Sequence, residues 1–112
     1  MNVTVQHAVL IQTGGDKRNV ARLTQTTKMP FPPHEGMLLH FGDRVLPVSL
    51  SIEHPVSWNF ATEEYGTFFL IDVFEEASRR QGHVDEEFFF RRLVSAGFIV
   101  DWLESEFSHL GE

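Results

Sequence analysis

Six side chains that could bind a metal ion fall within one short stretch of this 112-residue sequence. They are three histidines and three carboxylates: His34, Glu35, His40, Asp43, Glu53 and His54. Zinc and non-haem iron are held by these residue types, and a hairpin over 37–53 would bring several of them together. Zinc sites of this kind usually contain an H-E-x-x-H unit, but here a leucine, Leu38, stands where the second histidine would be. We therefore expect no metal site, and a metal-dependent enzyme built on the His34–His54 cluster stays an alternative.

A serine-histidine-aspartate set can be assembled on paper from the same stretch, with Ser49 or Ser51, His54 and Asp43. Serine hydrolases place the nucleophile in a G-x-S-x-G turn, and neither that turn nor a glycine-rich oxyanion loop occurs in the sequence. The sequence therefore predicts no catalytic residues. It also contains no cysteine, which excludes thiolate ligands, cysteine nucleophiles and disulfides.

Asp72 is the one charge in the apolar run 67–74. A carboxylate buried alone is costly, so this residue is either exposed on a half-open strand or placed in a functional pocket. We expect the exposed position, because charged side chains are seldom buried.

Charge is divided unevenly along the chain. The net charge is −7 overall, with +1 on residues 1–60 and −8 on residues 61–112. Such an acidic second half repels phosphate backbones, so we expect no direct binding of nucleic acid. An acidic excess can serve solubility alone, and it also suits a protein partner with a basic surface. The acids expected to make that contact are Glu63, Glu64, Glu75, Glu76, Glu86 and Glu87.

Alternating apolar residues predict that strands make up much of the fold that positions these groups. Trp58 is expected in the core because it shares a strand face with Val56 and Phe60. The threonine-rich strand at 19–27 is expected at an edge or twisted outward. The apolar strand at 67–74 is expected either in the centre of the sheet, covered on both faces, or in a closed barrel. That last strand should pair antiparallel with the one before it. The predicted strands cover residues 2–12, 19–27, 37–41, 45–53, 56–60 and 67–74.

Residues 85–96 predict the clearest helix. Asp85 is a suitable N-cap, and Gly97 is suited to the position that ends a helix. Residues 75–82 indicate a short helical turn or a connection. Residues 98–110 fit either a strand or a helix, and we choose a short strand at 98–103 followed by a helical tail. Together these elements predict one α+β domain over 1–112. It would be a curved, mainly antiparallel sheet or a partly open β-barrel with one helix packed across it.

The segment Pro-Phe-Pro-Pro-x-x-Gly-Met at 30–37 resembles short bacterial or mobile-element β-rich proteins. In those proteins a proline-rich stretch precedes a β-hairpin, and some end with a helix followed by a glycine-aromatic step, as at Gly97-Phe98. The resemblance covers about a third of the chain and includes no catalytic motif. It implies a small β-rich fold and carries no activity.

These features predict a small non-enzymatic protein that binds another protein as an inhibitor or adaptor, without a cofactor. The other alternative is a β-barrel whose aromatic interior binds a small molecule. The N-terminus lacks a signal-peptide pattern, and no apolar run approaches the ~18 residues of a membrane span. We therefore expect a cytoplasmic protein with no membrane partner.

Overall fold

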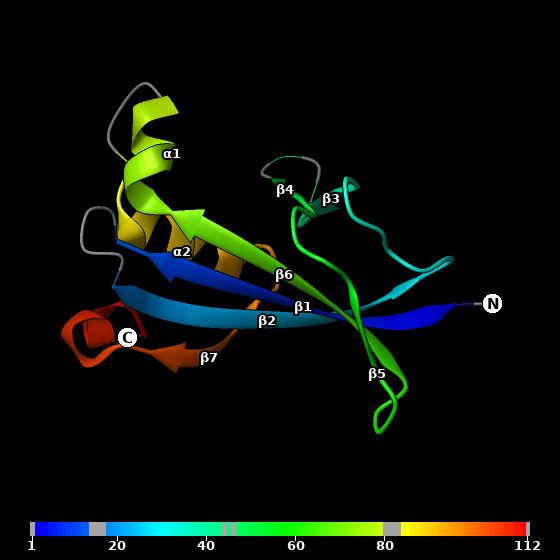
Figure 1. Cartoon of the computed structure of the whole chain (residues 1–112). Helices are drawn as coiled ribbons and strands as arrows, with labels where there is room; N and C mark the ends of the chain where they lie inside the picture. Colours follow the sequence, from blue (N-terminus) through cyan, green and yellow to red (C-terminus); the bar gives the residue numbers. More distant parts are fainter. Residues whose placement is uncertain (1, 14–17, 44, 46, 80–83, 112) are drawn as a thin grey trace.

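The described part of the chain folds into a five-stranded sheet, a separate two-stranded sheet and three helices (Figure 1). The computed structural model describes residues 2–13, 18–43, 45, 47–79 and 84–111. The strands are β1 (Val3–Gln12), β2 (Asn19–Met29), β3 (Leu38–Phe41), β4 (Val48–Ser51), β5 (Ser57–Asn59), β6 (Glu64–Asp72) and β7 (Ile99–Leu103). The helices are α1 (Val73–Arg79), α2 (Glu86–Ser95) and the 3-10 helix η1 (Ser105–Gly111).

The main sheet has the strand order β5-β6-β1-β2-β7, and its pairs are antiparallel except for β1 with β6. The prediction of an α+β fold with a mainly antiparallel sheet is therefore confirmed. The predicted antiparallel pairing of β5 with β6 is confirmed as well. Because β5 and β7 are the two ends of the sheet, the described strands form no closed barrel.

Two strands do not have the positions that their sequences predict. Strand β2 lies between β1 and β7 rather than at an edge, because β7 returns to it from the far end of the chain. Strand β6 is second in the order and is covered on one face only. Phe69 and Ile71 are buried on that face, whereas Leu70 is exposed on the other. Pairing between strands that are distant in sequence decides both positions, and the alternation of apolar residues within one strand does not reveal its neighbours.

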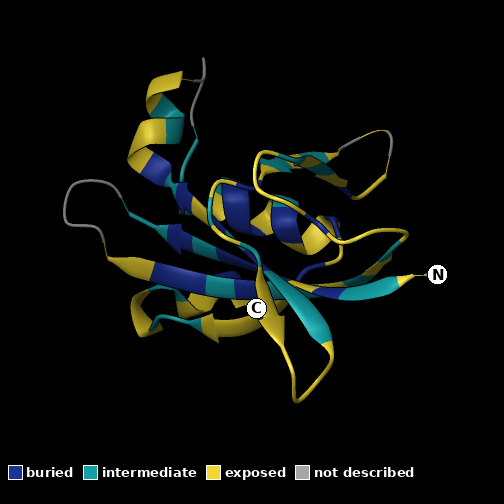
Figure 2. Cartoon of the chain, turned by 45° about the vertical axis from the view of Figure 1, so that its right-hand side comes forward, coloured by how far each residue is buried: buried dark blue, intermediate teal, exposed yellow. Residues whose placement is uncertain are grey.

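Helix α2 crosses one face of the sheet, behind the strands in Figure 1, and supplies much of the core. Its buried residues Phe89, Phe90 and Leu93 form one cluster with the buried side chains of β1, β2 and β6 (Figure 2). Asp85 caps the helix, since its Oδ1 accepts a hydrogen bond from the Phe88 amide at 2.9 Å. Gly97 follows the last turn with φ of +100°, a backbone angle that favours glycine. The helix predicted at 85–96 is confirmed.

Strands β3 and β4 form the hairpin predicted over 37–53, with Leu39 opposite Leu50 and Phe41 opposite Val48. Arg44 and Leu46, which the prediction also placed in this hairpin, lie outside the described residues. The hairpin packs against the core through its apolar face, where Phe41 is 6% exposed. A short two-stranded sheet is marginal alone, so this packing is what holds it in place.

The chain after α2 follows the predicted order of a short strand and then a helical tail. In that tail Leu110 is buried in the core cluster. Helix α1 corresponds to the helical turn predicted at 75–82, of which residues 80–82 lie outside the described part. No helix within the described ranges is long and apolar enough to cross a membrane.

Candidate functional site

Strand β5 and the start of β6 form a hairpin that extends away from the rest of the molecule, beyond the end of α2 (Figures 1 and 2). Three aromatic rings cluster on it: the Trp58 ring centroid lies 4.7 Å from that of Tyr65 and 6.1 Å from that of Phe60. Trp58 is 42% exposed and Phe60 is 86% exposed. The prediction that Trp58 is a core residue is therefore wrong. We call Trp58, Phe60 and Tyr65 the aromatic hairpin.

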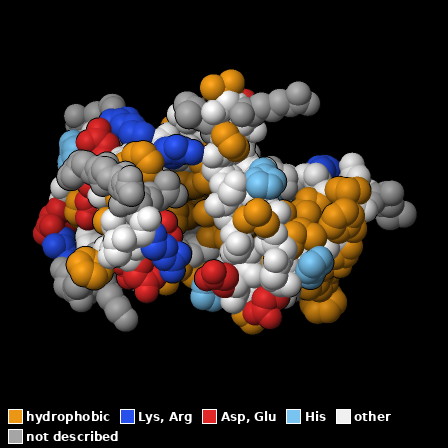
Figure 3. All heavy atoms as spheres, turned by 90° about the horizontal axis from the view of Figure 1, so that it is seen from above, with side chains coloured by type: hydrophobic (Ala, Val, Ile, Leu, Met, Phe, Trp, Pro, Cys, Tyr) orange, Lys and Arg blue, Asp and Glu red, His pale blue; other side chains and the backbone are white. Residues whose placement is uncertain are grey.

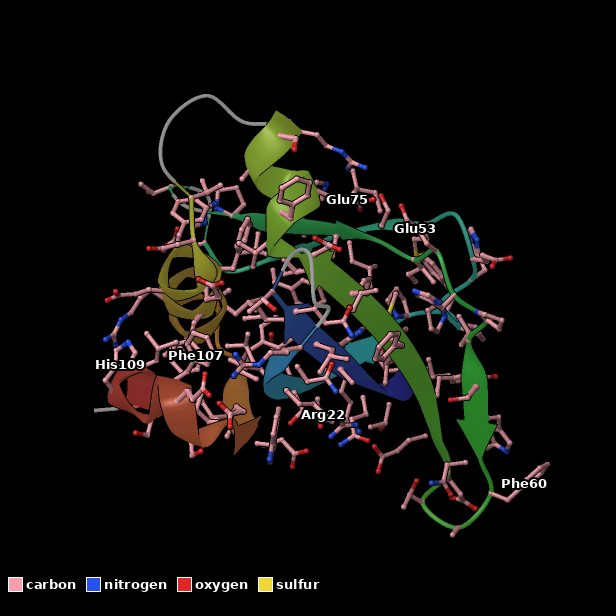
Figure 4. All side chains as sticks on the ribbon, turned by 60° about the vertical axis from the view of Figure 1, so that its left-hand side comes forward. Arg22, Glu53, Phe60, Glu75, Phe107 and His109 are labelled. Atoms are coloured by element: carbon pink, nitrogen blue, oxygen red, sulfur yellow. The ribbon has the colours of Figure 1, made fainter. Side chains whose placement is uncertain are left out.

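The pairing of β5 explains why these rings remain exposed. In the main sheet β5 is an edge strand that pairs only with β6, through Ser57 opposite Gly66 and Trp58 opposite Tyr65. A Cβ atom on Gly66 would lie 2.5 Å from the Ser57 Oγ, so a larger residue here would require the Ser57 hydroxyl to turn away. Figure 4 shows Phe60 at the end of the hairpin, pointing away from the body.

The three histidines of the predicted His34–His54 cluster point to different partners. The His34 Nδ1 lies 3.1 Å from the backbone oxygen of Glu35, and the His54 ring packs edge-on against Phe68 at 5.1 Å. His40 bonds across the β3–β4 hairpin instead. Among the described residues, no group of three or more histidine, aspartate or glutamate side chains could hold a metal ion.

The serine-histidine-aspartate set drawn from the sequence does not form either. Ser49 is bonded to His40 rather than to His54, with the His40 Nδ1 2.7 Å from the Ser49 Oγ. Asp43 accepts a hydrogen bond from the Val45 amide at 2.9 Å, which closes a local turn. His40 and Ser49 are directly opposite on neighbouring strands, and both are exposed. Their bond is an ordinary cross-strand pair on a solvent-facing surface.

Among the histidines that the structure describes, His7 is the buried one, at 1% exposure. Its Nδ1 lies 2.7 Å from the Thr67 Oγ1 and its Nε2 lies 2.8 Å from the Thr27 Oγ1, so the ring links β1 to both neighbouring strands. Burial lowers the pKa of His7 from 6.5 to about 4, because desolvation disfavours the charged imidazole. At neutral pH the ring is uncharged, and one nitrogen donates while the other accepts.

The six acidic residues predicted to contact a partner lie in three places. Glu63 and Glu64 are at the turn of the aromatic hairpin, where Glu63 has φ of +56°. Glu75 and Glu76 are in the first turn of α1, and Glu86 and Glu87 are in the first turn of α2. The nine-residue strand β6 separates the hairpin pair from the α1 pair, a span of roughly 27 Å. One continuous acidic patch does not form from all six.

Two adjoining clefts run along β4. The first, which we call the apolar cleft, has a volume of about 260 Å³ and lies between β4 and α2. The second, the acidic cleft, has a volume of about 240 Å³ and lies between β4, the end of β6 and α1. Seen from above, a hollow with hydrophobic side chains at its floor separates the lobe of α1 from the β3–β4 hairpin (Figure 3). Residues that line both clefts are Ser49, Leu50, Ile71 and Glu76.

The acidic cleft gathers four carboxylates and one guanidinium, from Glu53, Asp72, Glu75, Glu76 and Arg79. Figure 4 shows Glu53 and Glu75 reaching toward each other from the two sides. Asp72 is the last residue of β6, and its Oδ1 accepts a hydrogen bond from the Glu75 amide at 3.1 Å. The Asp72 carboxylate therefore caps the start of α1 and also lines the acidic cleft. It is neither fully exposed nor buried in a pocket, the two positions considered from the sequence.

Comparison of the chain with protein families, with curated proteins and with solved structures gives no match. The functional reading therefore rests on the geometry of this molecule.

Sequence reasoning missed the exposure of the aromatic hairpin and the buried position of His7. A signal existed in both cases. Trp58 alternates with the polar Ser57 and Asn59 directly before an acidic loop, which is typical of a hairpin end. His7 alternates with Val5 and Val9 on the apolar face of its strand, which is typical of a core position.

Proposed function

We propose that this chain is a non-enzymatic protein that acts by binding another protein, and that the aromatic hairpin is its main contact surface. The observation that supports the proposal is the clustering of Trp58, Phe60 and Tyr65 on a protruding hairpin. Exposed tryptophan and tyrosine side chains are enriched in protein interfaces, where a few buried aromatic anchors supply most of the binding free energy. Contacts between the rings also fix their positions before a partner arrives.

The acids at the turn define the chemistry of the partner. Glu63 is exposed and Glu64 is half-buried, and both belong to the same hairpin end as the exposed Phe60. A matching partner has an apolar pocket for the ring and basic residues around it. Glu75, Glu76, Glu86 and Glu87 lie toward the other end of β6, so their part in the proposal is confined to long-range attraction of a basic protein.

The test compares two phenylalanines of similar exposure. Phe60 is on the hairpin, and Phe74 is on α1 with 66% exposure. Immobilised wild-type protein and the variants Phe60→Ala and Phe74→Ala capture partners from lysate, and quantitative mass spectrometry compares the bound proteins. We expect Phe60→Ala to remove at least one protein that Phe74→Ala retains. The same captured proteins on all three surfaces would contradict the assignment to the hairpin.

A further inference from the structure

The apolar cleft has the dimensions and lining of a small ligand site. Its walls are Val48 and Leu50 of β4 on one side and Phe88, Phe89 and Leu93 of α2 on the other. A cavity of ~150 Å³ accommodates benzene, so the volume of about 260 Å³ accommodates a molecule with on the order of ten non-hydrogen atoms. The lining is also polar in large part, from groups that include Ser49, Glu76 and Arg92. Apolar walls for the body of a ligand and polar groups that fix its orientation are both found in ligand sites.

Arg92 is the positively charged side chain among the described residues that line this cleft. Two contacts hold its guanidinium in place: an Nη2 hydrogen bond of 2.8 Å to the backbone oxygen of Pro47, and a position 5.6 Å from the centroid of the Phe88 ring. A guanidinium has five N–H donors, and the bond to Pro47 uses one of them. The side chain therefore presents further donors at a fixed place on the cleft wall.

Arg92 differs from the other arginines in the described part of the chain. Arg18 pairs with Glu104 and Glu106, and Arg22 pairs with Asp101. Arg79 pairs with Glu76 at 3.7 Å and Arg91 with Glu87 at 3.6 Å. Within those described residues, Arg92 has no carboxylate within ion-pair distance. Since a guanidinium binds carboxylates with two parallel hydrogen bonds, an anionic ligand can take that place.

The opposite end of the cleft sets the orientation of a ligand. Glu76 lines that end, and the carboxylates of the acidic cleft lie beyond it. These charges repel an anion from the α1 end and favour it at the α2 end, near Arg92.

We propose that the apolar cleft binds a small carboxylic acid with an apolar body. The carboxylate pairs with Arg92, and the body lies between β4 and α2 over Ile71. This site is separate from the aromatic hairpin, so the proposal stands or falls independently of the proposed function.

The test uses octanoate and its neutral analogue 1-octanol as probes, with binding followed by amide chemical shifts. We expect octanoate to shift the amides of β4 and α2 and to bind at least about tenfold more tightly than 1-octanol, as one charged hydrogen-bonded pair would provide. Arg92→Met should remove the difference between the probes while 1-octanol still binds. The matched variant Arg91→Met, one residue away, should keep the difference.

A second variant separates cleft binding from surface adsorption. Val48→Trp fills the cleft and should abolish the binding of both probes, whereas Phe60→Ala should change neither. Equal affinity for the two probes in the wild-type protein would overturn the proposal, as would equal losses in the Arg91 and Arg92 variants. If Arg92→Met does not fold, the wild-type affinity ratio and Val48→Trp decide the question. Octanoate shifts confined to the aromatic hairpin would also overturn it.

Discussion

The β3–β4 hairpin and the β5–β6 hairpin carry similar apolar alternation but have opposite surroundings. In the first, the Phe41 ring lies 4.9 Å from His7 and 5.0 Å from Phe98, and it is buried. In the second, Trp58 and Phe60 contact each other and Tyr65 and remain exposed. Both hairpins put their apolar side chains on one face. Only the first has that face against α2 and the main sheet.

The difference shows that alternation identifies which side chains share a face but not whether another element covers it. A face of the sheet is covered only where α2 packs against it, and the β5–β6 hairpin extends beyond α2. The sequence of β5 itself carries no information about where α2 ends. An uncovered aromatic face costs free energy that a covered one gains, roughly 25 cal/mol for each Å² of apolar surface. Exposed aromatic clusters of this kind are typical of interaction surfaces, and this is the basis for proposing the aromatic hairpin as the contact.

The largest expected loss of stability comes from a substitution in the covered β3–β4 hairpin. Phe41→Ala removes a buried ring that contacts His7, Phe69 and Phe98, and it should lower the free energy of unfolding by about 3–5 kcal/mol. Phe60→Ala, on the uncovered hairpin, should change it by less than about 0.5 kcal/mol. Chemical denaturation of both variants checks the pair, and similar losses would contradict the contrast between the two hairpins.

The next effect concerns the pH dependence of the covered region, because His7 lies beneath Phe41. Below pH 6.5 the unfolded chain binds a proton at His7, which the folded protein does not bind until about pH 4. The stability that the neutral ring provides is therefore present above pH 6.5 and lost as the pH falls toward 4. The loss should be about 3 kcal/mol.

Two histidine variants isolate that contribution from the titration of carboxylates. Between pH 8 and pH 4 the unfolding free energy of the wild-type protein should fall by about 3 kcal/mol more than that of His7→Gln. His109→Gln, at an exposed position, should have the wild-type slope. Parallel curves for the wild-type protein and His7→Gln would show that His7 titrates normally in the fold.

A smaller effect is expected for Trp58→Ala. The ring keeps much of its exposure and contacts mainly its aromatic neighbours, so the loss of stability should be about 1 kcal/mol. Denaturant unfolding gives the value, and a loss near that of Phe41→Ala would return Trp58 to the core. Partner binding, once a partner is identified by capture, should fall far more than stability does.

Much of the secondary structure is predictable from local chemistry in this sequence. The helix at 85–96 has an N-cap, an apolar stripe and a terminal glycine, and the structure confirms it. The structure also contains the strand and helical tail chosen after Gly97. The local signal for the strand is the pair of β-branched residues Ile99 and Val100. Each of these signals acts within a few residues.

The arrangement of the strands and the candidate sites is less predictable, because both depend on contacts that are distant in sequence. The parallel pairing of β1 with β6 joins Val5 to Tyr65, and the apolar cleft joins β4 to α2. The histidines illustrate the same point. His40 meets Ser49 because the hairpin register places them opposite each other, whereas His34 contacts the Glu35 backbone and His54 contacts Phe68.

The smallest expected change in stability, and the sharpest test of the uncovered hairpin, is charge reversal at its turn. Glu63→Lys/Glu64→Lys should alter the free energy of unfolding by less than about 0.5 kcal/mol, because Glu63 is exposed, Glu64 is partly exposed, and solvated charges contribute little. The matched control Glu75→Lys/Glu76→Lys makes the same change in net charge at the other end of β6, roughly 27 Å away.

Distance decides what the two variants should do to partner binding. At physiological ionic strength charges are screened over about 8 Å, so the α1 pair is too far away to act on a partner held at the hairpin. We expect the hairpin reversal to slow association with the captured partner and the α1 reversal to leave it nearly unchanged at 0.15 M salt. At low salt the screening length grows to ~30 Å at 0.01 M, and both variants should then slow association. Association rates measured by surface plasmon resonance at the two salt concentrations test this. Equal slowing by both pairs at 0.15 M salt would mean that the acids act through net charge alone, and a larger effect of the α1 pair would move the contact to the acidic cleft.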